Sequence, residues 1–170
     1  EQSAWLENGN KNLDIIVTRC FSFIGPGLPL NQGYAAGNFV WDIAMGQDIR
    51  IKSDGKAVRS FLHPCDLVIW LITILLKGEQ KEIYNVGSEK TITIADLANL
   101  IRNVLKSPMQ VIIEGGRSTG IGADIYFPQT KKARALGLSE TCTLEESIIE
   151  LANSVRPGYN NRDIHRSAVS

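Results

Sequence analysis

The sequence is poor in the residues that build disulfide scaffolds and metal centres. Its 170 residues hold three cysteines, Cys20, Cys65 and Cys142, which are far apart and never spaced as Cys-x-x-Cys. The two histidines, His63 and His165, also lie far from one another, so no group of residues has the spacing of metal ligands. We therefore expect a reducing compartment, the cytoplasm, and no bound metal.

An excess of either charge is also missing. Eighteen Lys and Arg residues balance eighteen Asp and Glu residues, which predicts no long-range attraction to nucleic acid or to an anionic membrane. Any anion site must therefore be local. With 44% hydrophobic and 21% charged residues, the chain suits one globular domain or a little more. No signal peptide is visible, and because the chain opens at Glu1 without an initiator Met, its start looks cut.

No apolar run is long enough to span a membrane. The longest, Leu67–Leu76, is interrupted only by Thr73 and falls far short of the about 20 residues that a span needs. We predict a helix here with Asp66 as its N-cap, because this carboxylate can accept a bond from free backbone N–H groups. The helix is apolar on every face and must be buried in protein. Either it is the central core helix of a small domain, or one face packs on a part of the protein absent from this chain.

Strand and helix patterns alternate along the chain. Asp14–Thr18 is rich in β-branched residues and nearly continuous in apolarity, which is typical of a strand covered on both faces of a parallel sheet. We predict that this strand, a second one at Ile83–Val86 and the apolar helix belong to one sheet layer. The fold class is therefore predicted to be α/β.

A smaller lobe is predicted from the remaining elements. The Asp54-Gly55 pair lies between two short β-prone runs and favours a tight hairpin. Amphipathic spacing predicts a helix over Leu97–Leu105 that begins at Thr93, and a last helix over Leu144–Val155 capped by Thr143.

Four ordered motifs make the chain resemble a known family. They are R-x-F-x-x-x-G-P at Arg19–Pro26, G-x-x-x-R-S-F-x-H-x-x-D-L at Gly55–Leu67, Y-N-V-G-S at Tyr84–Ser88 and T-I-x-x-L-A at Thr93–Ala98. In this order they resemble the carboxyl-terminal half of the extended short-chain dehydrogenase/reductases that act on nucleotide sugars, the epimerase/dehydratase group. The resemblance covers residues 1–156, and residues 157–170 are expected to form a polar tail.

The resemblance implies part of a doubly wound Rossmann-type parallel sheet plus a small α/β substrate-binding lobe. It also implies NAD as cofactor, a nucleotide sugar as substrate and a homodimer. In the family, a sugar hydroxyl is oxidised by hydride transfer to the nicotinamide, with a Tyr-x-x-x-Lys pair as catalytic residues. This sequence contains neither that pair nor the glycine-rich nucleotide fingerprint, which the family carries upstream, so we expect the chain alone to be inactive.

Several reactions are compatible with this resemblance. We expect a sugar 4,6-dehydratase first, and a 4-epimerase or 4-ketoreductase next. A different class, a noncatalytic nucleotide-sugar-binding or assembly module, is the alternative. The sequence upstream of Glu1 separates these readings, because a glycine-rich strand–turn–helix followed by Tyr-x-x-x-Lys is required only for an enzyme.

Arg59 is the leading candidate for substrate binding, because it stands at the family's phosphate-binding arginine. A planar guanidinium matches diphosphate oxygens with two parallel hydrogen bonds. The alternative is a surface arginine paired with a neighbouring acid. Ser22 occupies a position where the family usually has an Asn that contacts the phosphate. Gln129 replaces the aspartate of a second family motif, and Arg117 could supply the lost contact.

Further candidates follow from the same resemblance. Asn38 and Phe39 match the start of a helix that borders the nucleotide base, where an amide can read base edges and a ring can stack. Their alternatives are a polar group near a helix cap and a core aromatic. Cys20 and Phe21 fall beside the nicotinamide, although Cys20 also suits the role of a small buried hydrophobe. His63 is expected to be a structural hydrogen-bonding group rather than an acid or base.

Overall fold

The computed structural model describes residues 14–115 and 124–155. The fold is mixed α/β, as predicted. The strands are β1 (Val17–Cys20), β2 (Ile49–Ile51), β3 (Val58–Ser60), β4 (Ile83–Val86), β5 (Thr91–Thr93), β6 (Val111–Ile113) and β7 (Ile125–Tyr126). The helices are α2 (Ala35–Ala44), α3 (Pro64–Lys77), α4 (Ile94–Val104), α5 (Lys131–Arg134) and α6 (Leu144–Ser154).

The described strands form three small sheets. β1 pairs in parallel with β4, so that Val17 lies opposite Ile83 and Cys20 opposite Val86. β2 pairs in parallel with β6. In the third sheet β3 lies between β5, which is antiparallel to it, and β7, which is parallel. The sheet layer expected from Asp14–Thr18 and Ile83–Val86 is present, although β1 begins only at Val17.

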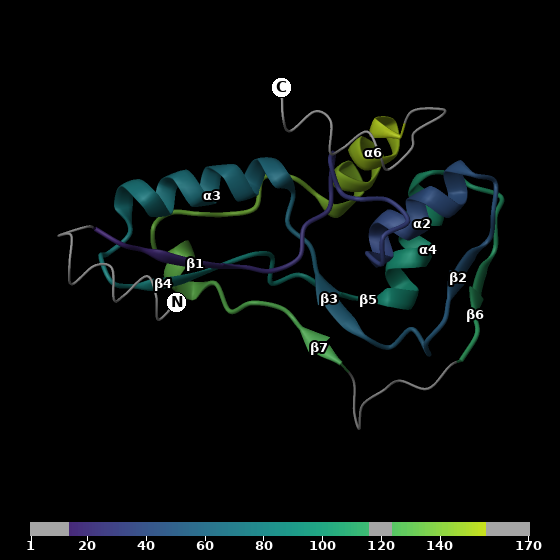
Figure 1. Ribbon diagram of the computed structural model, residues 1–170, viewed down its shortest axis with the longest axis horizontal. Coiled ribbons are helices and arrows are strands. Elements are labelled where there is room, and N and C mark those ends of the chain that lie inside the picture. The colour runs from purple at the N-terminus through teal and green to yellow at the C-terminus, as the bar shows by residue number, and fades with distance from the viewer. Residues whose placement is uncertain (1–13, 116–123, 156–170) are drawn as a thin grey trace.

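Two hydrophobic clusters stabilise the two ends of an elongated molecule. Figure 1 shows α3 beside the β1–β4 pair at one end, and α2, α4 and α6 gathered at the other. The buried residues of the first cluster, the α3 cluster, are Leu62, Trp70, Ile74, Tyr84, Val86, Ala133 and Leu138. Those of the second, the α2 cluster, include Ile24, Phe39, Val40, Ile49, Leu97, Ile101, Ile148 and Leu151.

The predicted hairpin around Asp54-Gly55 is wrong. Gly55 does adopt the left-handed φ of +74° that the turn signal indicated. However, β2 pairs with β6, and β3 pairs with β5 and β7, so the two strands flanking the turn join different sheets. The turn contacts the start of α4 instead, because the N–H of Ala95 donates to the carbonyl of Gly55 at 3.0 Å. A Cβ on Gly55 would lie 2.9 Å from the Ala95 side chain.

The apolar helix α3 begins earlier than expected. His63, not Asp66, is its N-cap, because the Cys65 N–H donates to His63 Nδ1 at 3.2 Å. Pro64 follows as the first helical residue, where its missing N–H has no cost. Asp66 is buried in the first turn and accepts from Thr141 and Cys142 instead. The caps at Thr93 and Thr143 are both confirmed, and Thr143 forms a full capping box with Glu146.

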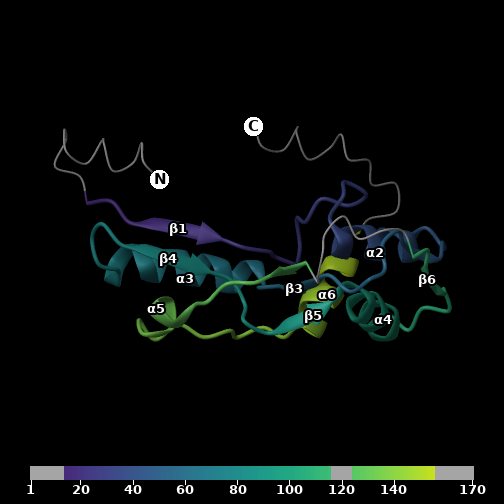
Figure 2. The ribbon, with the colours of Figure 1, turned by 90° about the horizontal axis from the view of Figure 1, so that it is seen from below.

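One face of α3 is exposed, so this helix is not the fully covered core helix of the first alternative. Trp70 and Ile74 point into the α3 cluster, while an apolar stripe faces solvent on the opposite side. The stripe comprises Val68, Ile69, Ile72, Leu75 and Leu76, with Leu76 75% exposed. Seen from the second direction, α3 again lies along β4 (Figure 2). No helix within the described ranges has the length and apolarity of a membrane span.

Candidate functional site

A cavity of about 550 Å³ lies where the chain leaves the carboxyl end of β1. Four segments form its walls: the loop after β1, the start of α2, β3 with the residue that follows it, and the first residue of α4, Ile94. Their lining residues include Phe21, Ser22, Tyr34, Ala35, Arg59 and Phe61. The carboxyl ends of parallel strands are where open α/β sheets bind ligands.

Backbone hydrogen bonds hold the loop after β1 against the segment that leads into α3. Phe23 and Leu62 form an isolated parallel bridge. The Leu62 N–H donates to the carbonyl of Ser22 at 3.0 Å, and the Ile24 N–H donates to that of Leu62 at 3.1 Å. Because Leu62 follows β3 closely, these bonds bring Ser22 and Arg59 to the same cavity from distant parts of the chain.

Gly37 allows the loop to pack closely on α2. A Cβ on this helical glycine would lie 2.5 Å from the carbonyl oxygen of Pro29, far inside van der Waals contact. The absence of a side chain therefore sets how near the loop comes to the helix, and with it the shape of the cavity wall that carries Pro29.

The guanidinium of Arg59 is held by three bonds. Nη1 donates to the carbonyl oxygens of Val58 and Asp124, each at 2.8 Å, and Nη2 forms an ion pair with the Asp124 carboxylate. The Arg59 side chain is 24% exposed and that of Asp124 62%. The arginine therefore has the acidic partner expected of a surface ion pair, and it also lines the cavity.

An aromatic ring lies against this arginine and is in contact with a second ring. Its guanidinium carbon lies 5.9 Å from the centre of the Tyr126 ring, within cation–π range. The Tyr126 and Phe21 rings are in contact, with centroids 4.9 Å apart. Sequence reasoning missed both Asp124 and Tyr126, since their approach to Arg59 depends on the parallel pairing of β7 with β3. In the sequence, Asp124 directly precedes a short β-prone run and Tyr126 lies within it, and this placement was the available signal.

A second cavity, of about 680 Å³, lies along α2 and β2. Its lining includes Asn38, Phe39, Asp42, Arg50 and Lys52. The Oδ1 atom of Asn38 is buried and has no hydrogen-bond partner in the described part of the chain. Burial raises the pKa of Asp42, although a backbone hydrogen bond at Arg50 opposes the shift. Asn38 and Arg59 therefore line different cavities.

The remaining predicted residues have separate surroundings. Phe39 is 4% exposed and belongs to the α2 cluster, which agrees with its alternative as a core aromatic. Cys20 is exposed at the end of β1 and is not the small buried hydrophobe considered for it. Arg117 lies outside the described residues, as does the polar tail. His63 is buried and caps α3, and its Nε2 lies 3.1 Å from a Glu150 oxygen.

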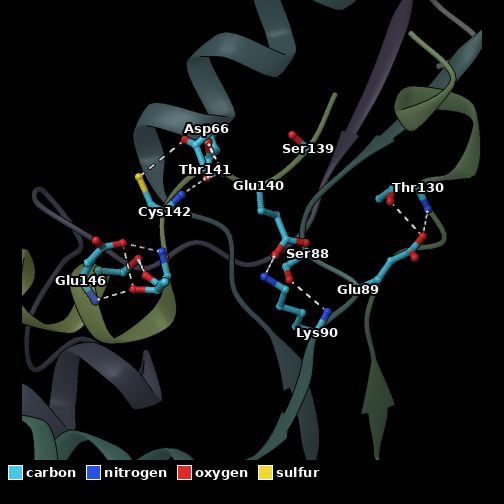
Figure 3. A network of polar contacts seen from close by, with 12 residues as sticks. Asp66, Ser88, Glu89, Lys90, Thr130, Ser139, Glu140, Thr141, Cys142 and Glu146 are labelled. Atoms are coloured by element: carbon cyan, nitrogen blue, oxygen red, sulfur yellow. Dashed lines mark hydrogen bonds and ion pairs between the residues drawn. The ribbon is translucent and has the colours of Figure 1, made fainter. Parts of the chain in front are cut away.

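A polar network joins the segment after β4 to the approach to α6 (Figure 3). Glu89 accepts from the N–H of Thr130 at 2.6 Å and from its hydroxyl at 2.8 Å, and these bonds lower the pKa of Glu89. Burial acts to raise the pKa of Glu140, but hydrogen bonds and charges from Lys90, Ser88 and Arg134 outweigh it and hold that pKa below its usual value. We assign this network a structural role. No described group of His, Cys, Asp and Glu residues could hold a metal ion.

The fold is that of a Rossmann-like α/β protein, with a cavity at the sheet's carboxyl edge. The model of the family described as "NAD dependent epimerase/dehydratase family" matches residues 1–87, more than half of the chain. The chain belongs to this family.

Curated relatives are enzymes of nucleotide sugars. A trifunctional UDP-glucose 4,6-dehydratase/UDP-4-keto-6-deoxy-D-glucose 3,5-epimerase/UDP-4-keto-L-rhamnose-reductase of Arabidopsis thaliana is 29% identical over 136 residues, which cover 80% of this chain and 20% of that protein. UDP-glucuronic acid decarboxylase 1 of the same plant is 25% identical over 89% of this chain and 34% of its own length. The dTDP-4-dehydro-6-deoxy-D-allose reductase of Streptomyces bikiniensis is 30% identical, over 56% of this chain and 29% of that enzyme.

Solved structures share the fold. The UDP-glucose 4-epimerase of Thermotoga maritima superposes with a TM-score of 0.77 at 19% identity, over 98% of this chain and 51% of that one. The UDP-N-acetylglucosamine 4-epimerase of Methanobrevibacter ruminantium gives a TM-score of 0.80 at 21% identity, over 91% of this chain and 50% of that one. The chain thus spans about half the length of these structures and about a third or less of the curated relatives cited above.

Proposed function

We propose that this chain is the carboxyl-terminal, substrate-binding part of an NAD-dependent enzyme that modifies nucleotide sugars. The observation that carries the proposal is the meeting of Phe21, Ser22 and Arg59 at one cavity beyond the end of β1. Of the possible reactions we favour a sugar 4,6-dehydratase, followed by a 4-epimerase or 4-ketoreductase. The Arabidopsis relative that aligns with 80% of the chain carries a 4,6-dehydratase activity in its name, which supports this order.

In this proposal two residues of the first cavity, Arg59 and Ser22, bind the diphosphate. Arg59 binds the diphosphate, because its planar fork of N–H groups suits phosphate oxygens. The hydroxyl of Ser22, in the same cavity, donates one further bond. Asn38 lines the second cavity and its Oδ1 is buried, so we assign it no bond to the same ligand.

The nicotinamide cofactor of the family fits only partly. Cys20 is exposed at the open end of β1, and Phe21 follows it with its ring against Tyr126, so these two residues can border a flat ring. When bound, the nicotinamide would accept a hydride from the sugar and later return it. The chain has no glycine-rich fingerprint that would hold its pyrophosphate, so those contacts must come from elsewhere in the complete enzyme.

Titration of uridine diphosphate into the complete enzyme tests the role of Arg59. Removing one charged, multiply bonded partner from a phosphate costs on the order of 2–3 kcal/mol, so Arg59→Ala should weaken binding about thirty- to a hundred-fold. Arg59→Lys should recover part of the loss, because it keeps the charge without the bidentate fork. Melting curves of each variant control for folding. Equal dissociation constants for parent and Arg59→Ala would remove Arg59 from the site.

A further inference from the structure

The Arg59–Asp124 pair consists of one covered and one exposed partner. The Arg59 side chain is 24% exposed, whereas the Asp124 side chain is 62% exposed and therefore largely in water. The carboxylate occupies Nη2, one of the nitrogens that a bidentate phosphate contact would use. An exposed ion pair of this kind is weak, so another anion can replace its carboxylate.

Backbone atoms hold the guanidinium in addition to that carboxylate. Nη1 is held by the carbonyl oxygens of Val58 and Asp124, which are backbone atoms. The same backbone is fixed by the pairing of β3 with β7, in which the Val58 N–H donates to the Asp124 carbonyl at 2.8 Å. The Tyr126 ring lies against the guanidinium and contacts Phe21 on the cavity wall.

We propose that the Asp124 carboxylate competes with the diphosphate of the nucleotide sugar for Arg59, and so sets the affinity of this site for its ligand. The inference rests on the proposed function, since it requires that Arg59 binds diphosphate. When a diphosphate enters, its oxygens take Nη2 and the carboxylate turns into solvent. The negative charge of Asp124 then remains close to the bound ligand and repels it.

Neutralising Asp124 should therefore tighten binding. In the complete enzyme, Asp124→Asn keeps the backbone carbonyl and the size of the side chain but removes the charge. We expect uridine diphosphate to bind about three- to tenfold more tightly to this variant, with the gain shrinking at about 0.5 M salt, where the Debye length is a few ångströms. Asp124→Glu, which keeps the charge, is the matched control and should bind like the parent. Asp124→Ser is a second uncharged variant should Asp124→Asn fold poorly.

The double variant Arg59→Ala/Asp124→Asn links the effect to the arginine. If the carboxylate acts through competition for Arg59, replacing Asp124 should change affinity far less in the Arg59→Ala background than in the parent. A merely structural ion pair would lower the melting temperature of Asp124→Asn and leave its affinity unchanged or weaker, which overturns the inference. If Arg59→Ala binds as well as the parent, the proposed function of Arg59 fails instead, so the two failures are distinguishable.

Discussion

The carboxylate of Asp66 accepts the backbone N–H of Thr141 at both of its oxygens, each at 3.1 Å, although the two residues lie 75 positions apart in the sequence. It also accepts the Thr141 hydroxyl and the N–H of Cys142, the latter at 3.1 Å. Asp66 is completely buried in the first turn of α3, and Cys142 directly precedes the cap of α6. This one side chain therefore joins the α3 end of the molecule to the helix that closes the α2 cluster.

Asp66→Asn should destabilise the protein markedly. The amide has one oxygen where the carboxylate has two, and it turns an NH₂ group toward backbone N–H donors that then lack a partner. Loss of buried hydrogen bonds to a charged group predicts a decrease of about 2–3 kcal/mol in the free energy of unfolding. Chemical denaturation measures this difference.

Asp96→Asn is the matched control for this variant. Asp96 also lies in the first turn of a helix, α4, but it is exposed, and its carboxylate accepts the Thr93 hydroxyl at 2.7 Å. Its loss should cost no more than about 1 kcal/mol. Similar losses from the two substitutions would mean that Asp66 acts as an ordinary first-turn acid.

Glu140→Gln should reduce stability in a pH-dependent way. The Glu140 side chain is 7% exposed and lies 2.9 Å from both Lys90 Nζ and Arg134 Nη2. Because its pKa is lowered in the folded state, its contribution is complete above the unfolded value and is lost as the pH falls through the lower folded value. We expect Glu140→Gln to lose about 1–2 kcal/mol at neutral pH.

The difference between parent and Glu140→Gln should therefore shrink as the pH approaches 3, which urea titrations at several pH values measure. Glu145→Gln, on the exposed side of α6, is the control and should differ from the parent by less than about 0.5 kcal/mol throughout. A constant difference across the acid range would contradict the assigned role of the Glu140 carboxylate.

The exposed stripe on α3 should make this 170-residue chain self-associate. An apolar surface of this kind on a helix usually marks a contact face, and the chain spans only about half of its solved structural relatives. Replacing Ile72 and Leu76 by Lys should shift light-scattering masses toward the monomer without lowering stability. Ile149→Lys, on α6, is the control, since Ile149 is exposed outside the stripe. If the chain without substitutions is monomeric and binds no hydrophobic dye, this prediction is wrong.

Local signals correctly predicted the starts of α4 and α6, because a cap involves residues only three positions apart. Thr93 with Asp96 and Thr143 with Glu146 both formed the expected bonds. The hairpin prediction was wrong because the turn is a local feature, whereas the pairing of its strands is not. The partner of β2 is β6, which lies some sixty positions later in the sequence. The prediction of Asp66 as a helix cap was wrong for a similar reason, since its carboxylate binds the N–H of Thr141, 75 positions further along the chain.

The candidate site shows the same division. Motif order brought attention to Arg59, Ser22 and Phe21, and the structure places all three at one cavity. The sequence could not indicate that Asp124 and Tyr126 surround Arg59, because that contact requires knowledge of which strand pairs with β3. It also could not separate Asn38 from Arg59, since both follow family motifs but line different cavities.

Gly37→Ala should weaken diphosphate binding although alanine favours helices. Helix propensity gives back about 1 kcal/mol, but the added Cβ would lie 2.5 Å from the Pro29 carbonyl oxygen and must push the loop after β1 away from α2. Because that loop carries the cavity wall, we expect a several-fold loss of affinity for uridine diphosphate in the complete enzyme. Gly137→Ala is the control: its φ of +89° makes alanine strained, but its Cβ meets nothing within 4 Å, so it should cost stability alone. Calorimetric titration and thermal melting of both variants separate the two effects, and unchanged affinity in Gly37→Ala would show that the loop can move without altering the site.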